Sequence, residues 1–177
     1  MRWLGVLFVG LAASAAWAEV ADSSASGFTV KVTLDIHAAP SDVFQKLMRD
    51  VGAWWSPEHT FSHNSHNLSI EEQVQGCFCE KLPDGGGVRH MEVVYLAPGK
   101  ALVLSGALGP LQSLAATGSL TIALAPASGG TKLDVSYAVA GYVPAGMNTW
   151  AAPVNSVVTE QFTRLKNYVE RGDPAAK

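Results

Sequence analysis

The most regular pattern in the chain lies at residues 28–36, where apolar and polar side chains alternate without a break. This period of two predicts a β-strand with one buried and one solvated face. Beyond a turn at Pro40, apolar residues change to helical spacing, at Val43, Phe44, Leu47 and Met48. We therefore expect a strand followed by a short amphipathic helix that ends near Asp50.

A tryptophan pair follows that helix. Trp54 and Trp55 provide a large apolar anchor, Gly52 permits a break before them, and Pro57 prevents simple helix continuation. A second short helix or tight turn is expected here. Residues 59–67 are rich in His, Ser and Asn, which predicts a loop.

The middle of the chain reads as an antiparallel meander. Six short strand-like runs occur, at residues 68–71, 77–80, 88–96, 101–104, 118–124 and 133–139. Glycine- and proline-containing segments separate several of them, at residues 83–87, 97–100 and 127–130. Such turn chemistry favours pairing of consecutive strands.

One long helix is predicted from Pro144 to about Glu170. Its apolar stripe comprises Trp150, Val154, Val157, Val158, Gln161, Leu165 and Val169. Pro153 implies either a regular start near Ala152 or a kink. Because a sheet with one wet face needs cover on its other face, this helix should pack across the sheet in a single α+β domain.

The N-terminus predicts export. Arg2 precedes an apolar run that ends in small residues at 15–18, which is typical of a signal peptide cleaved after Ala18. The run is shorter than the roughly 20 residues of a membrane-spanning helix, so no stable anchor is expected after cleavage. The predicted organisation is signal peptide 1–18, linker 19–27, domain 28–172 and disordered tail 173–177, in a periplasmic or secreted protein.

Charge limits the classes of binding partner that are expected, and the cysteine spacing bears on whether a disulfide forms. The net charge is −3 without any cluster of Lys or Arg, so nucleic acid is not an expected partner. Cys77 and Cys79 are the two cysteines. On a regular strand their Cα atoms would lie about 6.5 to 7 Å apart, at the upper limit for a disulfide, so we do not expect a bond between them even in an oxidising compartment.

Several segments together resemble the SRPBCC or START-like superfamily, also called helix-grip or Bet v 1-like, in its polyketide cyclase/dehydrase and Hsp90-activator-homologue-like branches. The segments that carry the resemblance are residues 36–44, 54–57, 82–86, 96–100 and 160–166. The resemblance implies a curved antiparallel sheet of about six or seven strands wrapped on a long C-terminal helix, with two short helices after the first strand. It also implies an apolar cavity for lipids, polyketides or similar molecules, and it predicts a ligand class rather than a reaction.

The ligand-binding candidates are mostly aromatic or apolar residues expected at such a cavity. They are Trp54, Trp55, His90, Tyr95, Leu111, Tyr142, Trp150 and Val154. Ordinary core packing is the alternative for the aromatic residues. Residues 106–114 are predicted to form a lid or cavity edge.

Catalytic and metal chemistry have fewer signals. We assign no catalytic residue, although His90 or His59 could serve as an acid or base. His63, His66, Cys77 and Cys79 could ligate a metal, but they match no zinc spacing, so no metal and no cofactor is predicted.

The leading hypothesis is an exported carrier for a hydrophobic small molecule. A cyclase- or dehydratase-type enzyme using a cavity histidine, and a metal- or partner-binding protein, are the alternatives.

Overall fold

The computed structural model describes residues 17–176, which form one antiparallel sheet and six helical segments, namely three α-helices and three short 3-10 helices. The predicted signal peptide falls mainly on residues 1–16 and so lies outside the described residues. Among the described helices, none is long and apolar enough to cross a membrane.

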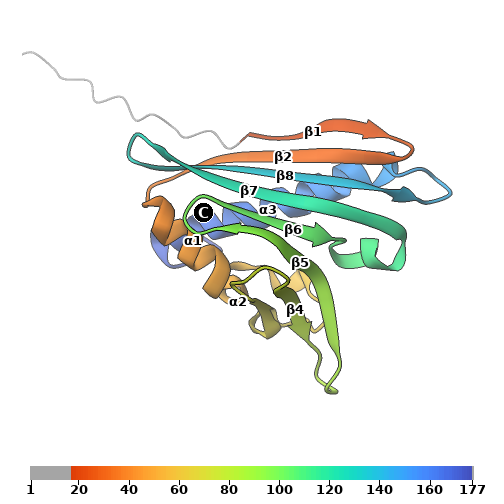
Figure 1. Cartoon of the computed structure of the whole chain (residues 1–177), viewed down its shortest axis with the longest axis horizontal. Coiled ribbons are helices and arrows are strands. Elements are labelled where there is room, and N and C mark those ends of the chain that lie inside the picture. The colour runs from red at the N-terminus through yellow and green to blue at the C-terminus, as the bar shows by residue number, and fades with distance from the viewer. Residues whose placement is uncertain (1–16, 177) are drawn as a thin grey trace, which may run out of the picture.

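The sheet has eight strands rather than the six or seven expected, in the order β1-β2-β8-β7-β6-β5-β4-β3. Their bounds are β1 Trp17–Ser24, β2 Gly27–Ile36, β3 Leu68–Ile70, β4 Cys77–Lys81, β5 Gly87–Ala97, β6 Ala101–Gly106, β7 Ala115–Ala127 and β8 Gly130–Tyr142. The helices are α1 Pro40–Arg49, α2 Val51–Trp54, η1 Pro57–His59, η2 Ser65–Asn67, η3 Gly109–Ser113 and α3 Asn148–Arg171. The strands curve around α3, which lies along the sheet (Figure 1).

The eighth strand is β1, formed largely by residues expected to be a linker. All of its residues are exposed, so its sequence carries no alternation of buried and solvated positions. It is held by antiparallel pairing with β2, in which Glu19 lies opposite Lys31. Cleavage after Ala18 would remove only the first two residues of this strand.

The core forms where β2, β7 and β8 face α3. The predicted alternation in β2 is confirmed, since its residues from Phe28 to Ile36 are buried at every second position. Facing them, α3 buries Ala151, Val158, Gln161, Phe162 and Leu165. The α1 helix adds the four apolar residues that its spacing predicted.

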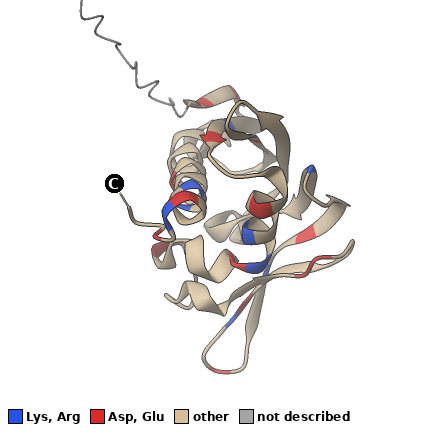
Figure 2. Cartoon of the chain, turned by 90° about the vertical axis from the view of Figure 1, so that its left-hand side faces the viewer, with Lys and Arg blue, Asp and Glu red and all other residues tan. Residues whose placement is uncertain are grey.

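The α3 helix begins at Asn148, between the two starts that its sequence allowed. Pro153 therefore lies inside the helix, where it cannot donate a backbone hydrogen bond to the preceding turn. The helix ends at Arg171 and is capped by Gly172, whose φ of 73° permits the left-handed turn that stops it. Seen along its axis, α3 lies beside the curved sheet, and charged positions are spread over several elements (Figure 2).

Residues 173–176, expected to be disordered, form a turn against the end of α3. The Asn167 side-chain Nδ2 donates to the Ala176 carbonyl oxygen at 2.8 Å. The structured chain therefore extends slightly beyond the predicted domain boundary.

Candidate functional site

A cavity of about 250 Å³ lies between the sheet and α3, lined mainly by apolar side chains. One wall is the face of α3 that carries Trp150, Val154, Val157, Val158 and Phe162. The opposite side is formed by strand residues such as Phe78 and Leu120, and the edge by η3 and residues 58–61. The volume is slightly below the range of roughly 300–1,000 Å³ typical of small-molecule pockets, as expected for a cavity that holds a small ligand.

Four rings form a continuous series along one side of the cavity. Trp55 packs edge-on against Phe78 with ring centroids 5.5 Å apart, and Phe78 lies 5.1 Å from His90. Phe61 stacks on the other side of His90 at 5.9 Å. His90 is therefore held between two aromatic rings in the cavity wall.

A β-bulge places His90 in this position. Phe78 of β4 pairs with Met91 and Cys79 pairs with Arg89, so His90 is the extra residue of β5 without a Cα partner on β4. A bulge re-aims side chains at such a point. As a result, His90 and Met91 are both buried although they are neighbours, with His90 only 5% exposed.

Glu80 lies behind His90 and is fully partnered. It is 1% exposed, and its Oε2 lies 3.0 Å from His90 Nε2. The same carboxylate accepts backbone hydrogen bonds from Phe61 and Ser62. Burial alone would raise the pKa of Glu80, but hydrogen bonds from Ser62, Phe61 and His90 outweigh it and lower the pKa.

The pKa of His90 is lowered in this arrangement, which favours the neutral imidazole. Burial lowers its pKa below the usual value, and the hydrogen bond and charge of Glu80 oppose that shift only in part. Since an ionised carboxylate can only accept, Nε2 carries the proton and donates to Glu80. Nδ1 is then an acceptor, with Gln112 Nε2 at 3.4 Å.

Gln161 is the polar member of the α3 wall. It is fully buried, and its Oε1 accepts a hydrogen bond of 2.8 Å from the backbone N–H of Ser56. Its Nε2 has no hydrogen-bond partner. An unpartnered buried donor is costly, so this atom marks a position where a ligand could supply an acceptor.

Tyr137 contributes a second buried polar group. Its hydroxyl accepts from the Leu108 N–H at 3.1 Å and donates to the Gly106 carbonyl oxygen at 3.4 Å. Burial raises its pKa to about 12. The hydroxyl thus ties the 106–108 segment to β8 and remains protonated.

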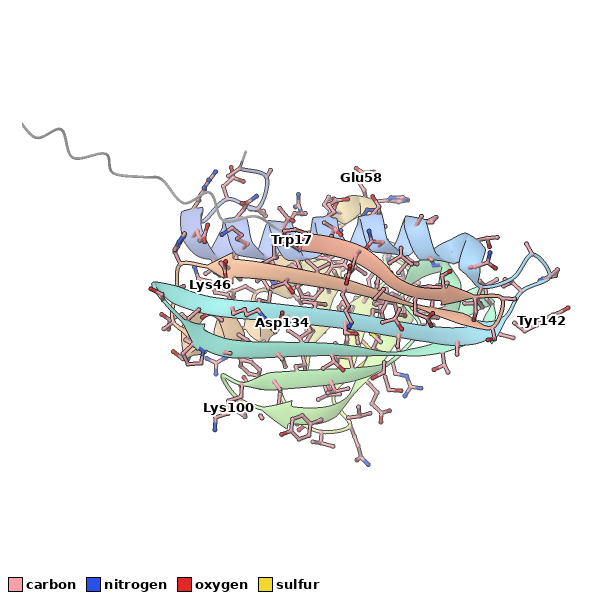
Figure 3. All side chains as sticks on the ribbon, turned by 90° about the horizontal axis from the view of Figure 1, so that it is seen from above. Trp17, Lys46, Glu58, Lys100, Asp134 and Tyr142 are labelled. Carbon is pink, nitrogen blue, oxygen red and sulfur yellow. A yellow bond between two sulfur atoms is a disulfide. The ribbon has the colours of Figure 1, made fainter. Side chains whose placement is uncertain are left out.

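The edge of the cavity near α3 is acidic. His59 Nε2 lies 3.0 Å from Glu160 Oε2, which links η1 to α3. Glu58 also borders the cavity, at the surface of the molecule (Figure 3). Among the described residues that border the cavity, none is Lys or Arg.

Five of the eight residues predicted to bind ligand border this cavity. They are Trp55, His90, Leu111, Trp150 and Val154. His59, the other candidate acid or base, also borders it. The segment 106–114 reaches the cavity through residues 108–111, with Leu111 buried.

The remaining three predicted ligand contacts lie elsewhere. Trp54 is buried behind the wall, against Trp55 and Phe162. Tyr95 is 54% exposed because a second register shift, between Val93 and Tyr95, interrupts the alternation of β5. Tyr142 is 72% exposed at the end of β8, where it projects away from the sheet (Figure 3).

The expectation that Cys77 and Cys79 remain unbonded is wrong, because they form a disulfide. Their Cα atoms lie 5.3 Å apart, closer than in a regular strand, beside the register shift between Phe78 and Cys79. Bonded cysteines offer no thiolate to a metal. His63 and His66 belong to no cluster of three or more metal-ligand side chains within residues 17–176.

Glu80 and Gln161 were not predicted as site residues. Glu80 shares a face of β4 with Phe78, and an acid on the face of a buried aromatic residue is the signal that could have found it. Gln161 was part of the predicted helical stripe. The signal that could have identified Gln161 is that it is the single amide side chain within an otherwise apolar stripe.

Comparison with known proteins supports the fold. Neither a family model nor a curated protein matches the chain. A conserved protein of unknown function from Enterococcus faecalis is similar in structure, with a TM-score of 0.60 and 18% identity over 92% of this chain and 80% of that one.

Two named proteins have similar structures. The Aha1 dimer from Colwellia psychrerythraea has a TM-score of 0.56 and 17% identity, covering 81% of this chain and 97% of the other. DynU16, from the dynemicin biosynthetic locus, has a TM-score of 0.57 and 18% identity, covering 84% and 49%. These similarities fit a helix-grip, SRPBCC-like fold.

Proposed function

We propose that this chain binds a small, mostly apolar molecule in the cavity between the sheet and α3, and that it does so as an exported carrier. The observation that carries the proposal is the cavity itself, which has apolar walls on both sides and few polar groups. Removal of apolar ligand surface from water drives such binding, at roughly 25 cal/mol per Å². The helix-grip fold of the similar structures agrees with a cavity in this place.

Two features favour export. The N-terminal sequence has the pattern of a cleaved signal peptide. The Cys77–Cys79 disulfide suits a periplasmic or extracellular compartment, where disulfides persist.

The direct experiment expresses the full chain with its N-terminal segment and isolates it from the periplasm for native mass spectrometry. The expected mass begins at Glu19 and carries a small-molecule adduct, which organic extraction identifies. Val157→Trp, which fills the cavity, should lose the adduct, whereas Ser156→Trp on the exposed neighbouring position should keep it. Retention of the adduct by Val157→Trp, or failure of the wild type to bind any apolar probe, would overturn the carrier proposal.

A second candidate is an enzyme in which His90 moves a proton on a bound ligand. Its support is the contact of His90 with Glu80 in the cavity wall, with Nδ1 held only by a long hydrogen bond. Conversion of the extracted ligand by the wild type but not by His90→Phe would favour the enzyme. Unchanged recovery of the ligand would favour the carrier.

A further inference from the structure

Gln161 presents its amide in a single orientation. The Ser56 N–H requires an acceptor, and Oε1 supplies it at 2.8 Å. Rotation of the amide by half a turn would set two donors against each other. The Nε2 group is therefore fixed as a donor, on a residue that lines the cavity.

The other buried polar side chains at the cavity already have partners. His90 uses both nitrogens, and the Tyr137 hydroxyl makes two hydrogen bonds. Thr60 donates to the Pro57 carbonyl oxygen. Within residues 17–176, Gln161 Nε2 is the buried side-chain donor of this cavity that lacks a partner.

Charge around the cavity selects against an anion. Glu58 stands at its edge and Glu80 lies behind His90, while no Lys or Arg side chain is among the described lining residues. A carboxylate ligand would lose its hydration without gaining a cationic partner. A neutral oxygen avoids that cost.

We infer that the ligand carries a neutral hydrogen-bond acceptor, such as a ketone, ester or amide carbonyl oxygen, and that Gln161 Nε2 selects it. This inference rests on the proposed binding function and names the ligand class. Because Nε2 is closed off from water in the empty cavity, the contact forms as side chains of the wall adjust around the ligand. The carbonyl then satisfies a donor that is otherwise buried without a partner.

The test uses two flat probes of nearly equal size, 2-acetylnaphthalene and 2-ethylnaphthalene. Calorimetric titration gives the affinity of each probe for the wild type and for Gln161→Met, which is similar in length and lacks the donor. The ratio of ketone to hydrocarbon affinity should fall about three- to tenfold in the variant. Loss of the Ser56 hydrogen bond affects both probes, so the ratio isolates the contact with the carbonyl.

A spectroscopic readout keeps the test valid if the variant folds poorly. The infrared carbonyl stretch of 2-acetylnaphthalene bound to the wild type should lie below its value in a hydrocarbon solvent, as for a hydrogen-bonded ketone. If both probes bind but neither the affinity ratio nor the carbonyl stretch changes, the inference on Gln161 fails and the carrier proposal stands. If neither probe binds to the wild type, the proposed function fails as well.

Discussion

The two ends of the sheet are built differently. Next to the exposed β1, which itself shifts register against β2 between Val20 and Asp22, the strands β2, β8 and β7 pair without a register shift. Apolar residues such as Val30 and Leu34 fill the space beneath α3 there. At the other end, the pairs β4–β5 and β5–β6 each contain a register shift. Buried polar groups and part of the cavity wall belong to this irregular end.

This difference assigns stability mainly to the regular region and ligand binding mainly to the irregular one. Regular pairing with apolar alternation packs residues such as Val30 and Leu34 closely, and neither of these residues lines the cavity. The bulge at His90 breaks the alternation and brings a polar side chain into an apolar wall. We expect the regular region to contribute most of the free energy of folding, so that the buried His90–Glu80 pair can be accommodated at the irregular end.

The largest predicted effect is a truncation at the regular end. Leu34→Ala should reduce the free energy of unfolding by about 2–5 kcal/mol, because neighbouring side chains cannot fill the space left behind. Val157→Ala should cost clearly less, since this side chain already borders open space. Urea denaturation measures the loss of unfolding free energy in both variants, and equal losses would contradict the distinction between the two regions.

Glu80→Gln should have the next largest effect, on the irregular end. The neutral amide weakens three hydrogen bonds that converge on the carboxylate, so we expect a loss of about 1.5–3 kcal/mol. Amide hydrogen exchange should accelerate at Phe61 and Ser62 before it does so in β2. Glu92→Gln, at an exposed ion pair, is the matched control and should change stability by less than about 0.5 kcal/mol. Slow exchange at both amides in Glu80→Gln would contradict the proposed anchoring of this loop.

Removal of the disulfide should have a smaller effect. A bond that closes a loop of three residues restrains the unfolded chain by only about 1.5 kcal/mol in the chain-entropy model. The double variant Cys77→Ser/Cys79→Ser should therefore remain folded, and chemical reduction of the wild type should match it in thermal denaturation. Unfolding of either protein at 25 °C would show that the bulge depends on the bond.

The smallest predicted effect is a change of pH dependence. Because the pKa of His90 is lower in the folded than in the unfolded state, the unfolded chain binds more protons as the pH falls below about 6.5. Stability should therefore decline from that pH downward. The lowered pKa of Glu80 adds a further loss as the pH falls below the usual range of a free glutamate and through the folded pKa.

The free energy of unfolding, measured at pH 7 and at pH 5, distinguishes the contribution of His90 from that of Glu80. His90→Phe should reduce the loss of stability between pH 7 and pH 5, whereas His66→Phe in the exposed loop should leave this loss unchanged. A wild-type slope that persists in His90→Phe would assign the effect to other groups.

Much of the fold could be predicted from the sequence, because most elements bury one side of a regular pattern. The β2 strand and the α1 helix follow their hydrophobic periods closely. The β1 strand was missed because it is an exposed edge strand, held by backbone pairing with β2 rather than by burial. Because pairing through backbone hydrogen bonds requires no particular side chains, it cannot be recognised from composition.

The site was predictable only in part, for a related reason. Trp150 and Val154, on the predicted α3 stripe, border the cavity because a regular helix keeps such residues on one side over many turns. Tyr95 and the disulfide were misjudged because register shifts change the facing and spacing of strand residues. Gln161 lay within the predicted stripe, but its free donor depends on a hydrogen bond from Ser56, more than a hundred positions away.

The central claim is that a ligand enters the irregular side of the fold and leaves the regular core undisturbed. Methyl NMR of the wild-type protein titrated with 2-acetylnaphthalene tests it most directly. We predict shifts concentrated at Leu111, Leu120, Val154 and Val158, with little change at Val30 and Leu34. Shifts at Val30 and Leu34 as large as those at the four cavity residues, or shifts confined to β2 and β8, would contradict binding in this cavity.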